Sequence, residues 1–178
     1  MQSNKNRLGL LCLIVVWLAG CASPANRSAL VVDDVPAATR HPHSVSITTS
    51  GGGETGAMDY TNISNEDLAG AIEDSIISSG LFNKVIKGDG ADYKLNVSII
   101  SMSKPMFGAS FKIDMEVAWS LVNAGTGNVV MREAIKSSHT ATMGDAFVAT
   151  KRVRLAVEGA AQNNIRDGLK KIAALKLH

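Results

Sequence analysis

The stretch Phe111-Lys112-Ile113-Asp114-Met115-Glu116-Val117-Ala118-Trp119-Ser120-Leu121 has a large apolar side chain at every second position. The positions between them hold charged or small residues, so apolar and polar character alternate with a period of two. This pattern predicts a β-strand with one face in a core and the other face in water, as in an antiparallel sheet.

A hairpin is expected to follow this strand. Residues 123–128 contain two glycines and are expected to form the turn. Residues 129–137, which mix apolar and polar side chains, are expected to form the returning strand. If Val122 lies opposite Val130, Glu116 faces Lys136, which is a favourable pair across two strands. The same register brings Glu133 to Trp119, so the sequence leaves the register open.

The rest of the chain predicts further strands and two helices. Strands are expected at 44–48, 82–87 and 93–99. Ser64 is a predicted N-cap with Asp67 three residues on, and Gly80 is a predicted left-handed C-cap. A long final helix at about 146–175 is expected, with Asp145 as its cap. The predicted order is β-α-β-β-β-β-α: one α+β domain over 44–178, with a mostly antiparallel sheet and two helices on one face.

The N-terminus has the layout of a secretory signal. Lys5 and Arg7 precede an apolar run at 8–19, which is shorter than the roughly 20 residues of a membrane-spanning helix. The run ends in Leu18-Ala19-Gly20-Cys21, which resembles the processing site of bacterial lipoproteins. We therefore expect a signal peptide at 1–20, followed by a lipidated cysteine and flexible tether at 21–43.

The lipoprotein resemblance implies a chemistry and an address. Leu18, Ala19 and Gly20 are expected to be recognised by the signal peptidase. Cys21 is expected to carry a diacylglyceryl thioether and, on its freed amine, an acyl chain such as palmitate. Ala22 stands where an Asp favours retention in the inner membrane. The predicted localisation is therefore the periplasmic face of the outer membrane.

Composition excludes several function classes. Without residues 1–20 the chain has 16 basic and 16 acidic residues, so it lacks the excess positive charge of a nucleic-acid-binding protein. Cys12 and Cys21 are the two cysteines, so the mature chain is expected to have no disulfide. No cofactor motif is found, and the covalent lipid is the only attached group that we expect.

Four groups of residues resemble parts of known phosphate-binding, metal-binding or catalytic sites, and we expect none of them to form such a site. The glycine-rich stretch 51–56 lacks the Lys and Ser/Thr of a phosphate loop, so we expect a flexible loop there. His41 and His43 have no nearby acidic cluster, and a catalytic triad from Ser137, Ser138, His139 and Asp145 lacks a nucleophile elbow. Copper would suit four residues near strand ends, which are Met102, Met106, Met143 and His139. We expect neither a metal site nor an enzyme.

A basic cluster, Lys151, Arg152 and Arg154, lies at the start of the last predicted helix. Such side chains bind the phosphates of anionic lipid headgroups when they lie near a membrane surface. Glu158 follows Arg154 by one helical turn and partly neutralises it. The cluster is a candidate headgroup contact, and the alternative is a solvated helix face.

From Ser79 onward the chain resembles a group of small bacterial outer-membrane lipoproteins. Their domain is similar to the N-terminal domain of TolB and to the auxiliary lipoproteins of ABC-type transport systems. The resemblance rests on Ser79-Gly80-Leu81-Phe82, on Ala91-Asp92-Tyr93, on Arg154-x-Ala156-x-Glu158-x-Ala160 and on Asn164-Ile165. It implies an accessory, non-catalytic protein that docks on or helps to assemble an envelope protein complex. The alternative is a periplasmic carrier of a lipid or small apolar ligand.

Overall fold

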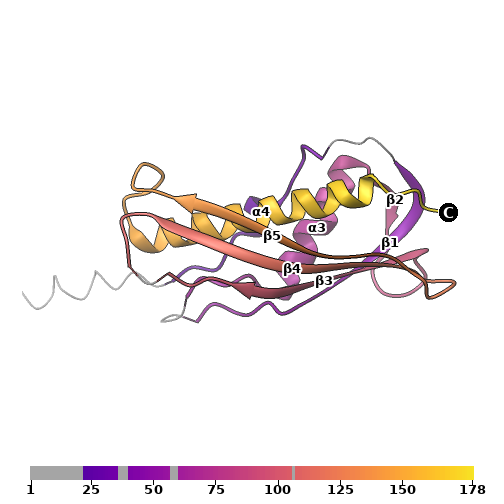
Figure 1. Ribbon diagram of the computed structural model, residues 1–178, viewed down its shortest axis with the longest axis horizontal. Helices are drawn as coiled ribbons and strands as arrows, with labels where there is room; N and C mark the ends of the chain where they lie inside the picture. Colours follow the sequence, from indigo (N-terminus) through magenta and orange to yellow (C-terminus); the bar gives the residue numbers. More distant parts are fainter. Residues whose placement is uncertain (1–21, 36–39, 57–59, 106) are drawn as a thin grey trace, which may run out of the picture.

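The computed structural model describes residues 22–35, 40–56, 60–105 and 107–178. Five strands, β1 (His41–Ser50), β2 (Phe82–Val85), β3 (Tyr93–Met102), β4 (Phe111–Asn123) and β5 (Val129–Ala141), form one sheet. The helices are α2 (Arg27–Leu30), α3 (Asn65–Ser79) and α4 (Ala149–Ala173). Figure 1 shows α3 and α4 along the same face of the sheet. The predicted order from the first strand to the last helix is confirmed.

The sheet is mixed, so the prediction of a mostly antiparallel sheet is wrong. Its strand order is β2-β1-β3-β4-β5, and β1 is parallel to both of its neighbours. The pairs β3–β4 and β4–β5 are antiparallel. The chain passes from β1 to β2 through α3, and such a helical crossover brings the second strand back parallel to the first. Alternation along β1 is the same for either direction, so the sequence pattern does not reveal it.

The alternation of β4 sorts its side chains as predicted. Its odd-numbered residues from Phe111 to Leu121 are buried, and the even-numbered ones are exposed or half-buried on the outer face. Under α4, the Trp119 ring lies so close to Gly168 that a Cβ there would come within 2.6 Å of the ring. The long helix therefore packs on the centre of β4 at a point where it has no side chain.

The hairpin register agrees with the predicted one over most of its length. Glu116 pairs with Lys136 and Trp119 pairs with Glu133, while an irregularity beyond Leu121 sets Val122 opposite Val129. Glu133 avoids burial because β5 is the edge strand of the sheet. Its carboxylate lies 3.2 Å from Nζ of Lys171 on α4. Because β5 is at the edge, Glu133 can lie opposite Trp119 without burying its carboxylate.

Both predicted caps of α3 are confirmed. The Asp67 amide donates to Ser64 Oγ at 3.0 Å, and Gly80 has the left-handed φ of 65°. The predicted cap of the last helix is wrong, because α4 begins at Ala149 and its N-cap, Val148, makes no side-chain capping bond. The Asp145 carboxylate instead accepts hydrogen bonds from the amide and hydroxyl of Thr142.

The predicted tether is wrong for residues 22–35 and 40–43. Residues 22–35 pack across α3 and α4, and Ala25, Leu30, Val32 and Val35 are buried. The Val32 amide donates to Ser75 Oγ on α3, and the Asn26 amide donates to the Glu158 carboxylate on α4. Residues 41–43 already belong to β1. The short run 29–32, too short to predict an element, is thus part of the core.

Candidate functional site

Two loops and the start of α4 form one end of the molecule. The loop before β4 and the loop after β5 leave the sheet together because Phe111 pairs with Ala141. Ser23 reaches the same region, where it lines a hollow of ≈ 220 Å³ with Thr150, Lys151 and Arg154. The chain segment that follows Cys21 therefore enters the fold beside the predicted basic cluster.

The structure divides this basic cluster by role. Arg152 is only 6% exposed, and its Nη1 donates to the carbonyl oxygens of Ala146 at 2.9 Å and Phe147 at 2.6 Å. Its guanidinium also lies 5.5 Å from the centre of the Phe111 ring. Arg152 thus holds the loop before α4, and it is not available for a headgroup. That part of the prediction is wrong, because the side chain points inward at the start of the helix.

Lys151 and Arg154 remain near solvent. Lys151 is exposed, whereas Arg154 is half-buried and its Nε lies 3.6 Å from the Glu158 carboxylate. Glu158 is itself buried and accepts the Asn26 amide at 2.8 Å. The headgroup contact predicted for these two cations is not tested by the structure and stays a prediction.

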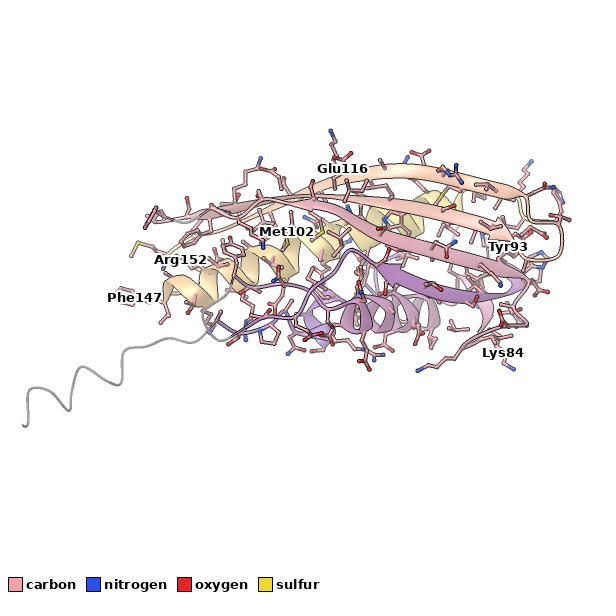
Figure 2. All side chains as sticks on the ribbon, turned by 90° about the horizontal axis from the view of Figure 1, so that it is seen from below. Lys84, Tyr93, Met102, Glu116, Phe147 and Arg152 are labelled. Carbon is pink, nitrogen blue, oxygen red and sulfur yellow. The ribbon has the colours of Figure 1, made fainter. Side chains whose placement is uncertain are left out.

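Two exposed phenylalanines at this end of the molecule were not predicted as site residues from the sequence. Phe107 is 90% exposed and Phe147 is 84% exposed, while the other two phenylalanines, Phe82 and Phe111, are buried. Figure 2 shows Phe147 at the end of the molecule opposite Tyr93 and Lys84. The available signal was the position of Phe107 next to Gly108 and of Phe147 close to Gly144, in loops between strongly patterned elements.

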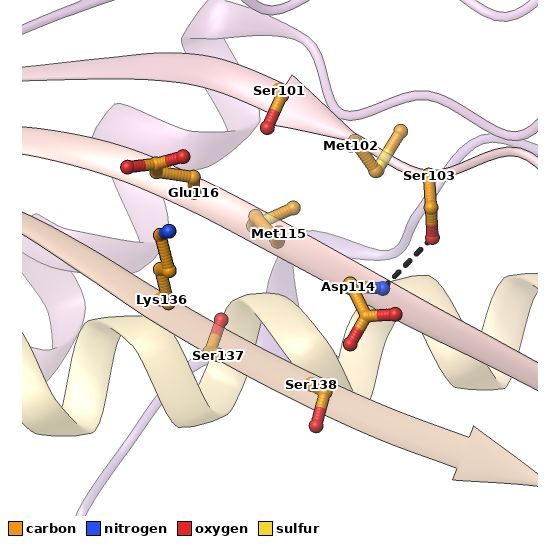
Figure 3. Close-up of a pocket in the computed structure, with 9 residues that line it drawn as sticks. All are labelled: Ser101, Met102, Ser103, Asp114, Met115, Glu116, Lys136, Ser137 and Ser138. Atoms are coloured by element: carbon orange, nitrogen blue, oxygen red, sulfur yellow. Dashed lines mark hydrogen bonds between the residues drawn. The ribbon is translucent and has the colours of Figure 1, made fainter.

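A hollow of ≈ 620 Å³, lined by both polar side chains and two methionines, lies where β3, β4 and β5 run side by side (Figure 3). The β3–β4 register shifts between Ile99 and Ser101, and this irregularity precedes the hollow. The Asp114 amide donates to Ser103 Oγ at 2.8 Å across its rim. Glu116 and Lys136 face each other on its outer side. The hollow can take a polar group, because serine, acidic and lysine side chains line it.

The triad candidates are used by the fold. The Ser137 hydroxyl donates to the Ala160 carbonyl and accepts from Asn164 Nδ2, so α4 uses both of its functions. Asp145 is held by Thr142, and hydrogen bonds from the Thr142 amide and hydroxyl lower the pKa of its carboxyl group. His139 lies against Gly159 of α4. These contacts give Ser137 and Asp145 structural roles, and the absence of enzyme activity stays a prediction.

The histidines and glycines of the first strand region also have structural contacts. His41 Nε2 lies 3.0 Å from the Ile172 carbonyl oxygen, and the His43 ring packs edge-on against Tyr93. Gly51, with a φ of 76°, approaches the backbone of Ile99 where no Cβ would fit. The Gly52 amide donates to Asn65 Oδ1. The flexible loop expected at 51–56 is thus anchored at its first glycines to β3 and to the start of α3.

Several predictions concern residues outside those that the structure describes. Leu18, Ala19, Gly20 and Cys21, the signal peptide and Met106 all fall there. Over the described ranges, no helix is both long and apolar enough to cross a membrane. Within the same ranges, no group of three or more His, Cys, Asp or Glu side chains could hold a metal ion.

Comparison with known proteins shows the fold but no family. No family model and no curated protein matches the chain. XCC0632 from Xanthomonas campestris, assigned to the family DUF330, has a similar structure with a TM-score of 0.59 at 15% identity, covering 76% of this chain and 87% of its own. The hypothetical protein CT253 from Chlamydia trachomatis has a TM-score of 0.55 at 10% identity, and the match covers 76% of this chain and 96% of CT253. A PelC dodecamer from Paraburkholderia phytofirmans has a TM-score of 0.51 at 15% identity, and the match covers 79% of this chain and 94% of the PelC chain.

These structures share the fold with this chain. Their names do not test the predicted resemblance to the TolB N-terminal domain, which stays a prediction.

Proposed function

We propose that this protein is a lipid-anchored accessory protein of the bacterial envelope, attached through Cys21 to the periplasmic face of the outer membrane. The observation that carries the proposal is the sequence Leu18-Ala19-Gly20-Cys21 after a short apolar run. Several acyl chains at one residue, each contributing about 0.8 kcal/mol per buried methylene, make such an anchor effectively permanent.

The start of the folded domain supports this proposal. Ser23 is two residues after Cys21 and already contacts the fold, since its carbonyl oxygen accepts from Thr61 Oγ1 at 3.1 Å. A lipid on Cys21 would therefore hold the domain directly at the bilayer, without the roughly 25 Å of reach that a tether of about 20 residues gives. The orientation of the domain toward the membrane would then be restricted.

The surfaces that the domain leaves open support the proposed accessory role. β5 is an edge strand of thirteen residues, so its outer backbone groups can pair with a strand of another protein. The outer face of β4 and β5 carries Lys112, Glu116, Arg132 and Lys136, which suits a polar interface with an envelope protein. A carrier function ranks second, because it needs an apolar space between helix and sheet, and Trp119 meets Gly168 at the centre of that interface.

The anchor is tested first. The full chain, Cys21→Ser and the control Cys12→Ser are expressed in a Gram-negative host with labelled palmitate. We expect label in the full chain and in Cys12→Ser, and a mass that corresponds to cleavage before Cys21. Cys21→Ser should be unlabelled and uncleaved. An unlabelled full chain would overturn the anchor, and sedimentation of labelled chain with the inner membrane would overturn the outer-membrane assignment.

The docking role is tested by crosslinking in cells. A photocrosslinker at Arg132, on β5, should capture one envelope protein, whereas the same group at Lys84, on β2, serves as the control. Specific capture at Arg132 supports docking through the β5 edge. If lipid or a small molecule co-purifies and no protein is captured, the carrier function replaces the docking function.

A further inference from the structure

Exposed apolar residues lie at the end of the molecule where Ser23 meets the start of α4, and they indicate a second membrane contact. We propose that Phe107, Phe147 and Val148 insert into the interface of a phospholipid bilayer, with Lys151 and Arg154 beside the phosphates. This inference rests on the proposed lipid anchor and adds a contact that the anchor does not require. It assigns the described residues of two loops, 103–105 with 107–110 and 142–148, here called the tip loops, to the membrane surface.

The tip loops expose a large amount of apolar surface. Phe107, Phe147, Val148 and Met143 are 90%, 84%, 57% and 53% exposed. Large apolar side chains that gather on a surface and are surrounded by polar residues mark an interaction site. Phenylalanine in such a position is typical of proteins that lie in the headgroup region of a bilayer.

The loop that carries Phe147 is held in place by hydrogen bonds. Arg152 binds the carbonyl oxygens of Ala146 and Phe147, and Asp145 binds the Thr142 amide. These contacts fix the backbone on both sides of the turn, while the Phe147 side chain stays in water. The apolar side chain is therefore presented by an ordered backbone, and it loses little further conformational entropy on insertion.

The position of the N-terminal segment and the exposed cations favour lipid as the partner of this surface. Ser23 lines the same hollow as Lys151 and Arg154, so the chain leading to Cys21 begins at this end. The lipid would enter the bilayer only two residues before Ser23. Lys104 in one tip loop and Lys151 next to the other are exposed cations, as anionic headgroups require. Asp145, an exposed acidic residue in one tip loop, already accepts two hydrogen bonds from Thr142.

The test measures depth in the membrane with the lipidated protein itself. Single cysteines replace Phe107, Phe147 or, as a control at the opposite end, Lys84, and each carries an environment-sensitive fluorophore. The proteins are placed in vesicles of phosphatidylethanolamine and phosphatidylglycerol, with or without nitroxide-labelled lipid. Flotation of the vesicles shows independently that the anchor is present.

We expect nitroxide lipid to reduce the fluorescence at positions 107 and 147 about twofold or more and to leave position 84 unchanged. Lys151→Glu should weaken the quenching at 147, and Ile77→Ser, which changes an exposed apolar residue on α3, should not. These substitutions lie at exposed positions, so circular dichroism should show an unchanged fold.

Two results would overturn the inference alone. In the first, the protein floats with the vesicles but its probes at 107 and 147 stay in water, so the anchor is present and the tip loops do not contact the membrane. Probes that become buried without quenching by lipid touch protein, for example a second copy of the chain. A chain that carries no lipid and does not float overturns the proposed anchor and this inference with it.

Discussion

Nε1 of Trp119 donates a buried 2.9 Å hydrogen bond to Oδ1 of Asn164, which connects the centre of β4 to the centre of α4. The amide nitrogen of the same Asn164 donates to the Ile135 carbonyl and to Ser137 Oγ on β5. One side chain on α4 therefore satisfies polar groups on two adjacent strands. This gives Asn164, which the resemblance singled out without a role, a structural function.

Replacing Asn164 by leucine should destabilise the fold by about 1–3 kcal/mol, because buried donors and acceptors lose their partners. Urea unfolding monitored by far-UV circular dichroism, which does not depend on Trp119, measures this loss. A double-mutant cycle with Trp119→Phe, which removes the indole donor, should show coupling between the two positions. Asn163→Ala, whose bond to the Ser138 carbonyl is exposed, is the control and should cost less. Additive losses in the cycle would contradict the coupling.

Two glycines of α4 should respond differently to alanine. At Gly168 a Cβ would lie 2.6 Å from the ring of buried Trp119, so Gly168→Ala should destabilise by about 1–3 kcal/mol. At Gly159 the neighbour is exposed His139, whose ring can turn into solvent. Gly159→Ala should therefore be neutral or gain up to about 1 kcal/mol from helix propensity. Thermal unfolding distinguishes the two, and equal losses would contradict this account.

The packed N-terminal segment predicts a stability effect that a tether would not show. Leu30 is fully buried, and Leu30→Ala should destabilise the fold by about 2–5 kcal/mol. Ser28→Ala, at an exposed position of the same short helix, is the control. Limited proteolysis should leave residues 22–35 intact in the native protein and cut them first in Leu30→Ala. Early cleavage of the native protein there would support the tether instead.

Stability should fall in acid partly through Asp92. Hydrogen bonds from the amide and hydroxyl of Ser44, both 2.7 Å, hold the pKa of the Asp92 carboxyl group below its usual 3.8. Because the folded pKa is the lower one, this group stabilises the fold above about pH 3.8, and the contribution is lost as the pH falls through the folded pKa.

Asp92→Asn should therefore lower the unfolding temperature near neutral pH and converge with the unchanged chain in strong acid. Ser44→Ala removes one of the two donors and should give a smaller difference in the same direction. A constant difference between Asp92→Asn and the unchanged chain at every pH would show that the Asp92 charge has no part in it.

The site could be predicted only in part. The basic residues at the start of the last helix were visible as a cluster, but the inward turn of Arg152 depends on the carbonyl groups of residues 146 and 147. Phe107 and Phe147 carry no periodic signal, because each lies in a loop. Their common position arises from the pairing of Phe111 with Ala141, which joins loops that are far apart in the chain.

The sequence by itself determined the features that depend on near neighbours in the chain. These are the alternation of β4, most of the hairpin register, and the Ser64 and Gly80 caps of α3. Tertiary structure alone decided the parallel direction of β1, the burial of residues 22–35 and the approach of Trp119 to Gly168. The physical reason is that periodicity and capping follow from local backbone geometry. Strand direction and burial instead depend on contacts between segments that are distant in the sequence.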